Sequence, residues 1–163
     1  MNELDFYANL VVNGEILECT LGHSLEAWES TLGSDFLDDR QKNRLRRDYD
    51  FVELSFQRVT QGWLCFGISV QVHRLARGNP EAVPAALIDT YGTFRSALPF
   101  EDLSDCARQE GAQLQVTDDS PQGEFARLVA SGSNVHAEVV VSQTDSPTLS
   151  EVWAINVSGR TVV

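Results

Sequence analysis

The sequence predicts an α+β fold in a single domain over residues 1–163, with an antiparallel sheet built from hairpins and helices packed on one side. Apolar residues recur at every second position in some segments and at every third or fourth position in others. The helical segments are grouped apart from the paired strand segments, whereas a doubly wound sheet would alternate them. With 163 residues, of which 42 % are apolar, the chain is long enough for one core.

Two helices are expected first. Apolar residues recur at helical spacing over 4–11, and Asn13-Gly14 supplies either the left-handed stop of this helix, which we favour, or a hairpin turn. An extended run is expected at residues 15–21. Ser24 is then a good N-cap for a second helix at residues 25–32, which ends at the glycine that follows.

A charged surface loop and a hairpin come next. Residues 35–47 are too charged for a core and are expected at the surface. The apolar period then changes to two, which predicts a strand at 51–56, a turn at 59–62 and a longer strand at 63–75. The side chains predicted to share one face of the longer strand are Leu64, Phe66, Ile68, Val70 and Val72. We expect this face to be core, so that truncating Phe66 leaves a cavity; the alternative is an exposed apolar patch for a partner.

The second half predicts two further helices and the rest of the sheet. Pro84 begins a short helix that ends at Gly92, and Pro99 begins another that ends at Gly111. Strands are expected at residues 113–117, 125–129, 135–141 and 152–157, the second and third of them as a hairpin.

Charge is sorted by segment. Residues 1–39 carry nine carboxylates and no Lys or Arg, residues 40–77 carry eight cations and three carboxylates, and residues 78–163 carry four cations and twelve carboxylates. A chain with a net charge of −12 repels nucleic-acid phosphates and anionic lipid over most of its surface and attracts basic macromolecules. We therefore expect a protein partner, and neither nucleic acid nor a membrane.

No motif for catalysis, a cofactor or a metal stands out. His23, His73 and His136 are far apart in sequence, without HxH or HxxxH spacing and without cysteine at ligand spacing. Ser69 lies inside a predicted strand and lacks the second glycine of a nucleophile elbow. We therefore predict no catalytic site, no cofactor site and no metal site, and no cofactor. The three cysteines are expected to be buried free thiols; they are Cys19, Cys65 and Cys106.

Acidic clusters are the candidate partner-binding residues, although paired carboxylates usually form a solvated face. The full candidate set is Asp35, Asp38, Asp39, Asp48, Asp50, Glu101, Asp102, Asp105, Asp118 and Asp119. The segment 35–39 with Asp48 and Asp50 is the first choice for a docking surface, because its charge is dense and it has no core to pack against.

The basic stretch at residues 40–47 is expected to pair internally. It has acidic flanks and no interleaved aromatic residues, and on a helix its cations would point all round instead of forming one stripe. The arginines suited to bidentate bridges with neighbouring carboxylates are Arg46, Arg47, Arg58 and Arg74.

The expected location is the cytoplasm. The first ten residues carry acids where a secretory signal needs bases, and no stretch approaches the roughly 18 apolar residues that span a bilayer.

Two stretches resemble a known group of proteins. The first is Leu21-Gly22-x-Ser24-x-x-x-Trp28-x-x-x-Leu32-Gly33. The second is Leu45-Arg46-Arg47-Asp48-Tyr49-Asp50-Phe51-Val52-Glu53-Leu54-Ser55-Phe56. They are similar to small actinobacterial proteins encoded beside polymorphic or contact-dependent toxins and taken to be their immunity proteins. The resemblance covers the first half of the chain and implies tight binding of one toxin domain in the cytoplasm, without chemistry of its own.

The expected function is therefore that of an immunity protein or inhibitor. It would act as a monomer or weak homodimer on a toxin domain such as a nuclease or another basic enzyme. Aromatic residues near the acids would supply anchors for binding; they are Phe36, Tyr49, Phe100 and Trp153. The alternatives are a small enzyme with a spatially assembled site around His73 or His136, and a non-catalytic scaffolding domain.

Overall fold

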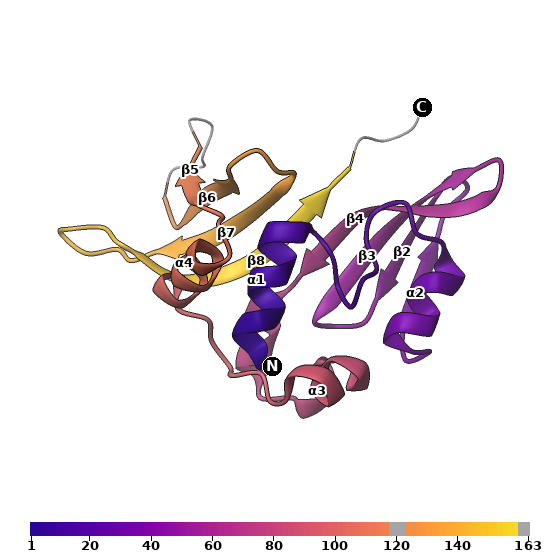
Figure 1. Cartoon of the computed structure of the whole chain (residues 1–163), viewed down its shortest axis with the longest axis horizontal. Helices are drawn as coiled ribbons and strands as arrows, with labels where there is room; N and C mark the ends of the chain where they lie inside the picture. Colours follow the sequence, from indigo (N-terminus) through magenta and orange to yellow (C-terminus); the bar gives the residue numbers. More distant parts are fainter. Residues whose placement is uncertain (118–122, 160–163) are drawn as a thin grey trace.

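The computed structural model describes residues 1–117 and 123–159, which form an antiparallel eight-stranded sheet with α-helices on one of its faces (Figure 1). The helices are α1 (Glu3–Asn13), α2 (Leu25–Leu32), α3 (Ala85–Tyr91) and α4 (Phe100–Gln109), with 3₁₀ helices η1 (Val72–Arg77) and η2 (Pro80–Ala82). The strands are β1 (Leu37–Arg40), β2 (Arg44–Asp48), β3 (Val52–Val59), β4 (Gly62–Val70), β5 (Leu114–Val116), β6 (Phe125–Ala130), β7 (Val135–Val141) and β8 (Leu149–Ser158). The predicted α+β class is confirmed.

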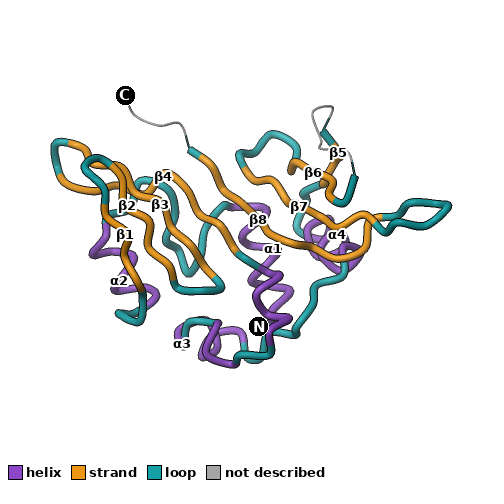
Figure 2. Tube along the Cα trace, turned by 180° about the vertical axis from the view of Figure 1, so that it is seen from behind, coloured by secondary structure: helices purple, strands orange, loops and turns teal. Residues whose placement is uncertain are grey.

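The strand order is β1-β2-β3-β4-β8-β7-β6-β5, so the C-terminal strand β8 joins the two halves of the sheet. It pairs with β4 on one side and with β7 on the other. Seen from behind, the sheet lies in front of α1, α2 and α4 (Figure 2). We call the face turned to the viewer in Figure 2 the open face, because α1, α2 and α4 all lie behind the sheet in that view.

The first helix is confirmed, and the hairpin alternative at Asn13-Gly14 is wrong. The Asn2 side chain caps α1, and Gly14 ends it in the left-handed conformation with φ 66°. Residues 15–21, however, are not extended. Ile16 and Cys19 bond each other's backbone around a tight turn at Leu17 and Glu18, whose φ values are 49° and 68°. Neither of these two residues is Gly or Asn, so the sequence lacks the usual signal for this turn.

The second helix has the predicted limits. The Ser24 Oγ accepts a hydrogen bond from the Ala27 backbone N–H at 3.2 Å, and the chain leaves the helix at Gly33. Trp28 and Leu32 are buried, as their spacing predicts. The helix therefore presents one apolar face to the sheet.

The segment 35–47, predicted as a charged surface loop, contains strands β1 and β2 instead. They pair antiparallel, from Leu37 opposite Asp48 to Arg40 opposite Leu45. Burial alternates along β2, so Leu45 and Arg47 face the core. An arginine at an inward position hid the period-two pattern from the sequence analysis.

Strand β4 is shorter than predicted. It ends at Val70, and η1 follows where the sequence predicted continued strand. Val72 and Leu75 are both buried from η1. They are three residues apart, which is the repeat of a 3₁₀ helix. The predicted continuation of the strand to Leu75 is therefore wrong.

The predicted core face of β4 is also interrupted by a bulge. Ser55 pairs with Gly67 but Phe56 pairs with Cys65, so Phe66 is an extra residue on β4. As a result Cys65 is buried, whereas Phe66 is half-buried and lines the open face. The prediction that Phe66 is a core residue is therefore wrong.

The second half agrees with the sequence analysis. Helices α3 and α4 follow Pro84 and Pro99, and the 125–141 hairpin forms β6 and β7. The helical layer meets the sheet at an aromatic cluster with ring centroids 5.3 to 6.5 Å apart. Its members are Phe6, Tyr7, Phe51, Tyr91 and Phe94. These edge-to-face contacts fix α1 and α3 against the start of β3.

The bulge gives a direct test of the core. Phe56→Ala is expected to lower the free energy of unfolding by about 3 to 5 kcal/mol, because a fully buried ring leaves a cavity. Phe66→Ala should cost about 1 kcal/mol or less, because its ring lies on the open face. Urea unfolding followed by circular dichroism measures both. Equal costs, or a larger cost for Phe66, would contradict the assigned register.

Candidate functional site

The two stretches that carry the immunity-protein resemblance contact each other through Arg47. Its side chain is 5 % exposed, and Nε and Nη2 donate to the two carboxylate oxygens of Asp38 at 3.0 and 3.1 Å. Nη1 donates to the backbone carbonyl of Leu25 at 3.2 Å, at the start of α2. Phe36 covers the guanidinium, with 3.7 Å between the guanidinium carbon and the ring centroid. Burial lowers the pKa of Arg47, but the hydrogen bonds and charge of Asp38 outweigh it, so the pKa is raised.

Tyr49 makes a second link between the same stretches. Its hydroxyl donates to the carbonyl of Gly33 at 2.7 Å, just after α2. Burial raises the pKa of Tyr49 to about 12, so the hydroxyl keeps its proton at neutral pH. Phe36 packs edge-to-face on the Tyr49 ring at 5.4 Å. Arg47 and Tyr49, from the second of the two stretches, therefore hold it against α2 and Gly33. Two of the predicted anchors for a partner, Phe36 and Tyr49, pack against each other in this internal contact.

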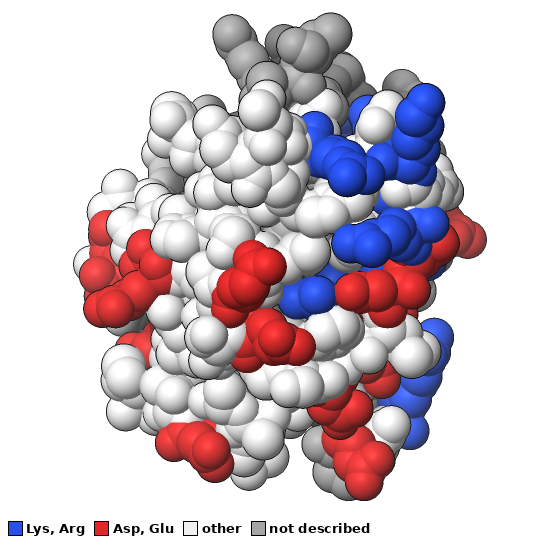
Figure 3. All heavy atoms as spheres, turned by 90° about the vertical axis from the view of Figure 1, so that its right-hand side faces the viewer, with Lys and Arg blue, Asp and Glu red and all other residues white. Residues whose placement is uncertain are grey.

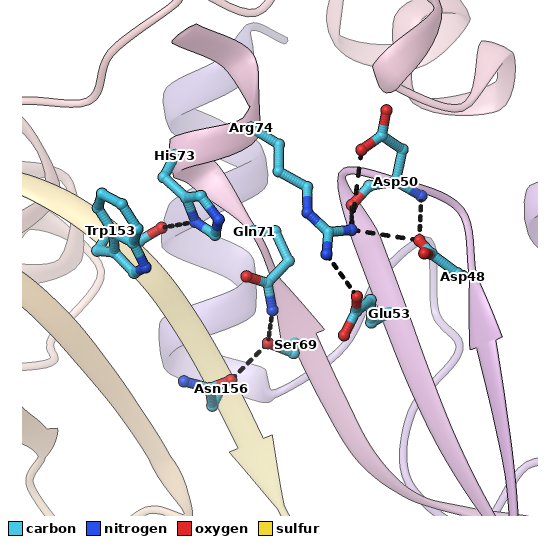
Figure 4. A network of polar contacts seen from close by, with 9 residues as sticks. All are labelled: Asp48, Asp50, Glu53, Ser69, Gln71, His73, Arg74, Trp153 and Asn156. Atoms are coloured by element: carbon cyan, nitrogen blue, oxygen red, sulfur yellow. Dashed lines mark hydrogen bonds and ion pairs between the residues drawn. The ribbon is translucent and has the colours of Figure 1, made fainter. Parts of the chain in front are cut away.

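Asp48 and Asp50, predicted as docking residues, belong to an ion-pair network around Arg74 (Figure 4). Arg74 Nη1 donates to the Asp50 carbonyl at 2.7 Å and to Asp48 Oδ1 at 3.3 Å, and Nη2 donates to Glu53 Oε1 at 2.7 Å. Asp50 has a φ of 71°, so this network holds a left-handed residue in the turn between β2 and β3. Both carboxylates stay partly exposed, at 35 % and 39 %.

The other predicted carboxylates fall into three groups. Asp38, Asp102 and Asp105 form ion pairs with arginine. The exposed carboxylates for which the described residues offer no ion pair are Asp35, Asp39 and Glu101. Asp118 and Asp119 lie outside the described residues. The candidate set is thus spread over β1, the β2–β3 turn and α4 and does not form one surface.

A groove on the helical side gathers carboxylates that the sequence analysis missed. Its volume is about 530 Å³, and it lies between α1, the Leu17–Glu18 turn and the ends of α3 and α4. Its carboxylates are Asp5, Glu15, Glu18 and Glu110. The lining also includes apolar and aromatic side chains, among them Val12, Leu17 and Tyr91, and none of the described Lys or Arg residues lines it. We call this the acidic groove. No local signal could have found it, because the carboxylates come from separate segments.

The open face carries a row of hydrogen-bonded polar side chains beside the stacked rings of His73 and Trp153 (Figure 4). Ser69 Oγ donates to Asn156 Oδ1 at 2.6 Å and accepts from Gln71 Nε2 at 2.5 Å. The rings of His73 and Trp153 stack at 4.1 Å, and His73 Nδ1 donates to the Trp153 carbonyl at 3.2 Å. Trp153 is 38 % exposed, so this predicted anchor, unlike Phe36 and Tyr49, offers part of its ring to a partner.

His136 lies in a shallow hollow of about 450 Å³ on the same face, with Glu53, Ser69 and Glu138. Burial lowers its pKa, and the nearby Arg127 lowers it further. Asn156 pairs with both Ser69 and His136, so β8 separates these two residues. Two strand spacings are roughly 9 to 10 Å, beyond hydrogen-bond reach. Ser69 and His136 therefore do not make a nucleophile and base.

The predicted internal pairing of the basic stretch holds for Arg47, which bridges to Asp38. Arg74 also forms its expected bridge, whereas Arg46 and Arg58 have no ion pair within the part of the chain that the structure describes. We define the basic hairpin as Arg40, Lys42, Arg44, Arg46 and Arg58. Figure 3 shows the side of the molecule that carries α2 and the first strands; most Lys and Arg atoms gather at the upper right of this view, a further group lies lower on the right, and Asp and Glu lie beside them.

The cysteines are free and buried, as predicted. Burial raises the pKa of Cys65 to about 12 and of Cys106 to about 11, so both thiols stay protonated at neutral pH. Among residues 1–117 and 123–159, no group of three or more His, Cys, Asp or Glu side chains is placed to hold a metal ion. None of the described helices is long and apolar enough to cross a membrane.

Comparison with known proteins gives no relative: no family model, curated protein or solved structure matches the chain.

The environment of His136 makes a pH-dependent prediction. Its folded-state pKa lies below the ordinary value of about 6.5, so the unfolded chain binds the proton more readily. His136 should therefore reduce stability progressively as the pH falls through about 6.5, and His136→Gln should remove this part of the acid destabilisation. Urea unfolding at pH 7 and pH 5 and the NMR titration of the His136 ring test it. A ring midpoint at or above 6.5 would contradict the prediction.

Proposed function

We propose that the chain is an immunity-type inhibitor that binds a cognate bacterial toxin domain in the cytoplasm and neutralises it without chemistry of its own. The observation that carries the proposal is the acidic groove, which four carboxylates line together with apolar side chains and without a described Lys or Arg. The net charge of −12 and the resemblance of the first half of the chain to immunity proteins support it.

The acidic groove fits a basic partner on physical grounds. A concave site lined by one sign of charge focuses the electric field and raises the rate at which an oppositely charged protein associates. Apolar side chains such as Val12 and Leu17 offer area that a partner can bury once the charges have brought it in. A toxin that binds nucleic acid presents a basic surface of this kind.

A neutralisation assay tests the function itself. A gene for a long secreted protein with a variable C-terminal domain is expected beside the gene for this chain. Producing that domain in bacteria should stop growth, and co-producing the chain should restore it. The purified proteins should form a complex with one copy of each. No complex and no rescue would contradict the proposed function.

Charge reversal tests the acidic groove separately. Glu18→Lys with Glu110→Lys should slow association with the toxin domain by roughly tenfold at low salt and weaken its salt dependence. Both side chains are exposed, so thermal unfolding should change little. Stopped-flow association kinetics at two salt concentrations measure the effect.

A matched control changes the same net charge elsewhere. Glu124→Lys with Asp145→Lys alters two exposed carboxylates next to the loop between β7 and β8. This control should slow association much less than the groove variant. Equal slowing by both would mean that only net charge matters. Asp35→Lys with Asp39→Lys tests the segment first predicted to dock, and a larger effect there would place the interface on β1.

A further inference from the structure

Among residues 1–117 and 123–159, the basic hairpin has no carboxylate partner for its charge. None of its five cations lies within ion-pair distance of a carboxylate among the described residues. The chain holds 24 carboxylates and only 12 Lys and Arg, so acids are not scarce. Arg47 and Arg74, from the same basic segment, are both paired. The missing partners of the basic hairpin therefore need a separate explanation.

Two aromatic rings hold three of these arginines in place. The guanidinium carbons of Arg40 and Arg58 lie 5.3 and 5.8 Å from the Trp63 ring, and that of Arg44 lies 5.4 Å from the Phe66 ring. Such a contact uses the ring face and the guanidinium charge, while the N–H donors stay available for other acceptors. Because the rings already order these side chains, an acceptor that binds them loses less conformational entropy.

The geometry of the strands brings these donors to one end of the sheet. Arg44 is opposite Gln57, next to Arg58, and Arg40 is opposite Leu45. The Arg58 backbone N–H also bonds the Asn43 carbonyl at 3.0 Å, which ties β3 to the turn between β1 and β2. Arg44 and Arg46 line a hollow of about 340 Å³ with Phe66 and Ser55. Arg44, Arg46 and Phe66 therefore form a cationic and partly aromatic hollow on the open face. Arg40 and Arg58 lie with Trp63 on the helical side, because Arg40 is opposite the buried Leu45 and Arg58 is opposite Trp63.

We propose that the hollow of the basic hairpin on the open face binds a short acidic segment of a partner protein, whose carboxylates accept hydrogen bonds from Arg44 and Arg46. A guanidinium matches a carboxylate in a bidentate geometry, as Arg47 and Asp38 do in this chain. β1 is the edge of the sheet, so an extended segment has room to lie along it.

The acidic surroundings of the basic hairpin favour a short protein segment over nucleic acid as the partner. The exposed acid Asp39 lines the hollow and lies opposite Arg46. Charges are screened beyond about 8 Å at physiological salt, so a few carboxylates sense mainly the local cations. A long polyanion would continue onto the acidic surroundings and be repelled there.

An NMR titration tests the proposal. The probe is a synthetic peptide of alternating glutamate and glycine, added to the ¹⁵N-labelled chain at about 0.15 M salt. Backbone signals of β1, β2 and the part of β4 around Phe66 should shift, because these segments line the hollow. Trp28 is fully buried and Trp153 lies on β8, so their indole signals serve as internal controls and should not move.

Variants separate this surface from general charge effects. Arg44→Gln with Arg46→Gln should weaken peptide binding roughly tenfold or more, because two charged donors are lost. Arg77→Gln with Arg108→Gln removes the same charge outside the basic hairpin and should leave binding within about twofold. Absent shifts, equal weakening by both variants, or tighter binding of a single-stranded oligonucleotide than of the peptide would overturn the proposal.

Discussion

The ion pair between Arg47 and Asp38 connects β1 to the start of α2, two elements that share little other packing. All four residues of β1 are exposed, so this strand contributes no buried side chain of its own to the core. Its attachment depends on backbone pairing with β2 and on the carboxylate of Asp38, which reaches the buried guanidinium. Removing a guanidinium from water costs several kcal/mol, and here the carboxylate, the Leu25 carbonyl and the Phe36 ring offset that cost together. The same pair connects the β1–β2 hairpin, which carries the basic residues, to the start of α2.

The outline of the fold follows from residue periodicity, and its exceptions have local causes. Ser24, Gly33 and Pro99 mark helix ends correctly, because capping is decided by a few neighbouring residues. The turn at Leu17 and Glu18 has no sequence signal, because residues that rarely adopt positive φ occupy it. The bulge that turns Phe66 outward depends on pairing between two strands, which one strand's sequence does not reveal.

The candidate surfaces were less predictable than the fold. Most of the predicted carboxylates lie at the surface, yet several form ion pairs within the chain, with Arg47, Arg74 and Arg95. The acidic groove depends on tertiary contacts between α1, α3 and α4 and could not be read from any one segment. The sorting of charge along the chain nevertheless has a spatial counterpart. The basic segment forms the first edge of the sheet, while the acidic groove lies among the helices, so the molecule offers two surfaces of opposite sign.

A double-mutant cycle on Arg47 and Asp38 tests the central claim most directly. Arg47→Met, Asp38→Asn and the combined variant would be compared with the unchanged chain by urea unfolding. If this pair anchors β1 to α2, each single substitution should cost about 3 to 5 kcal/mol, and the coupling energy should be about 2 to 3 kcal/mol. A coupling below about 0.5 kcal/mol, the level of an ordinary surface pair, would show that the first edge of the sheet does not depend on this contact.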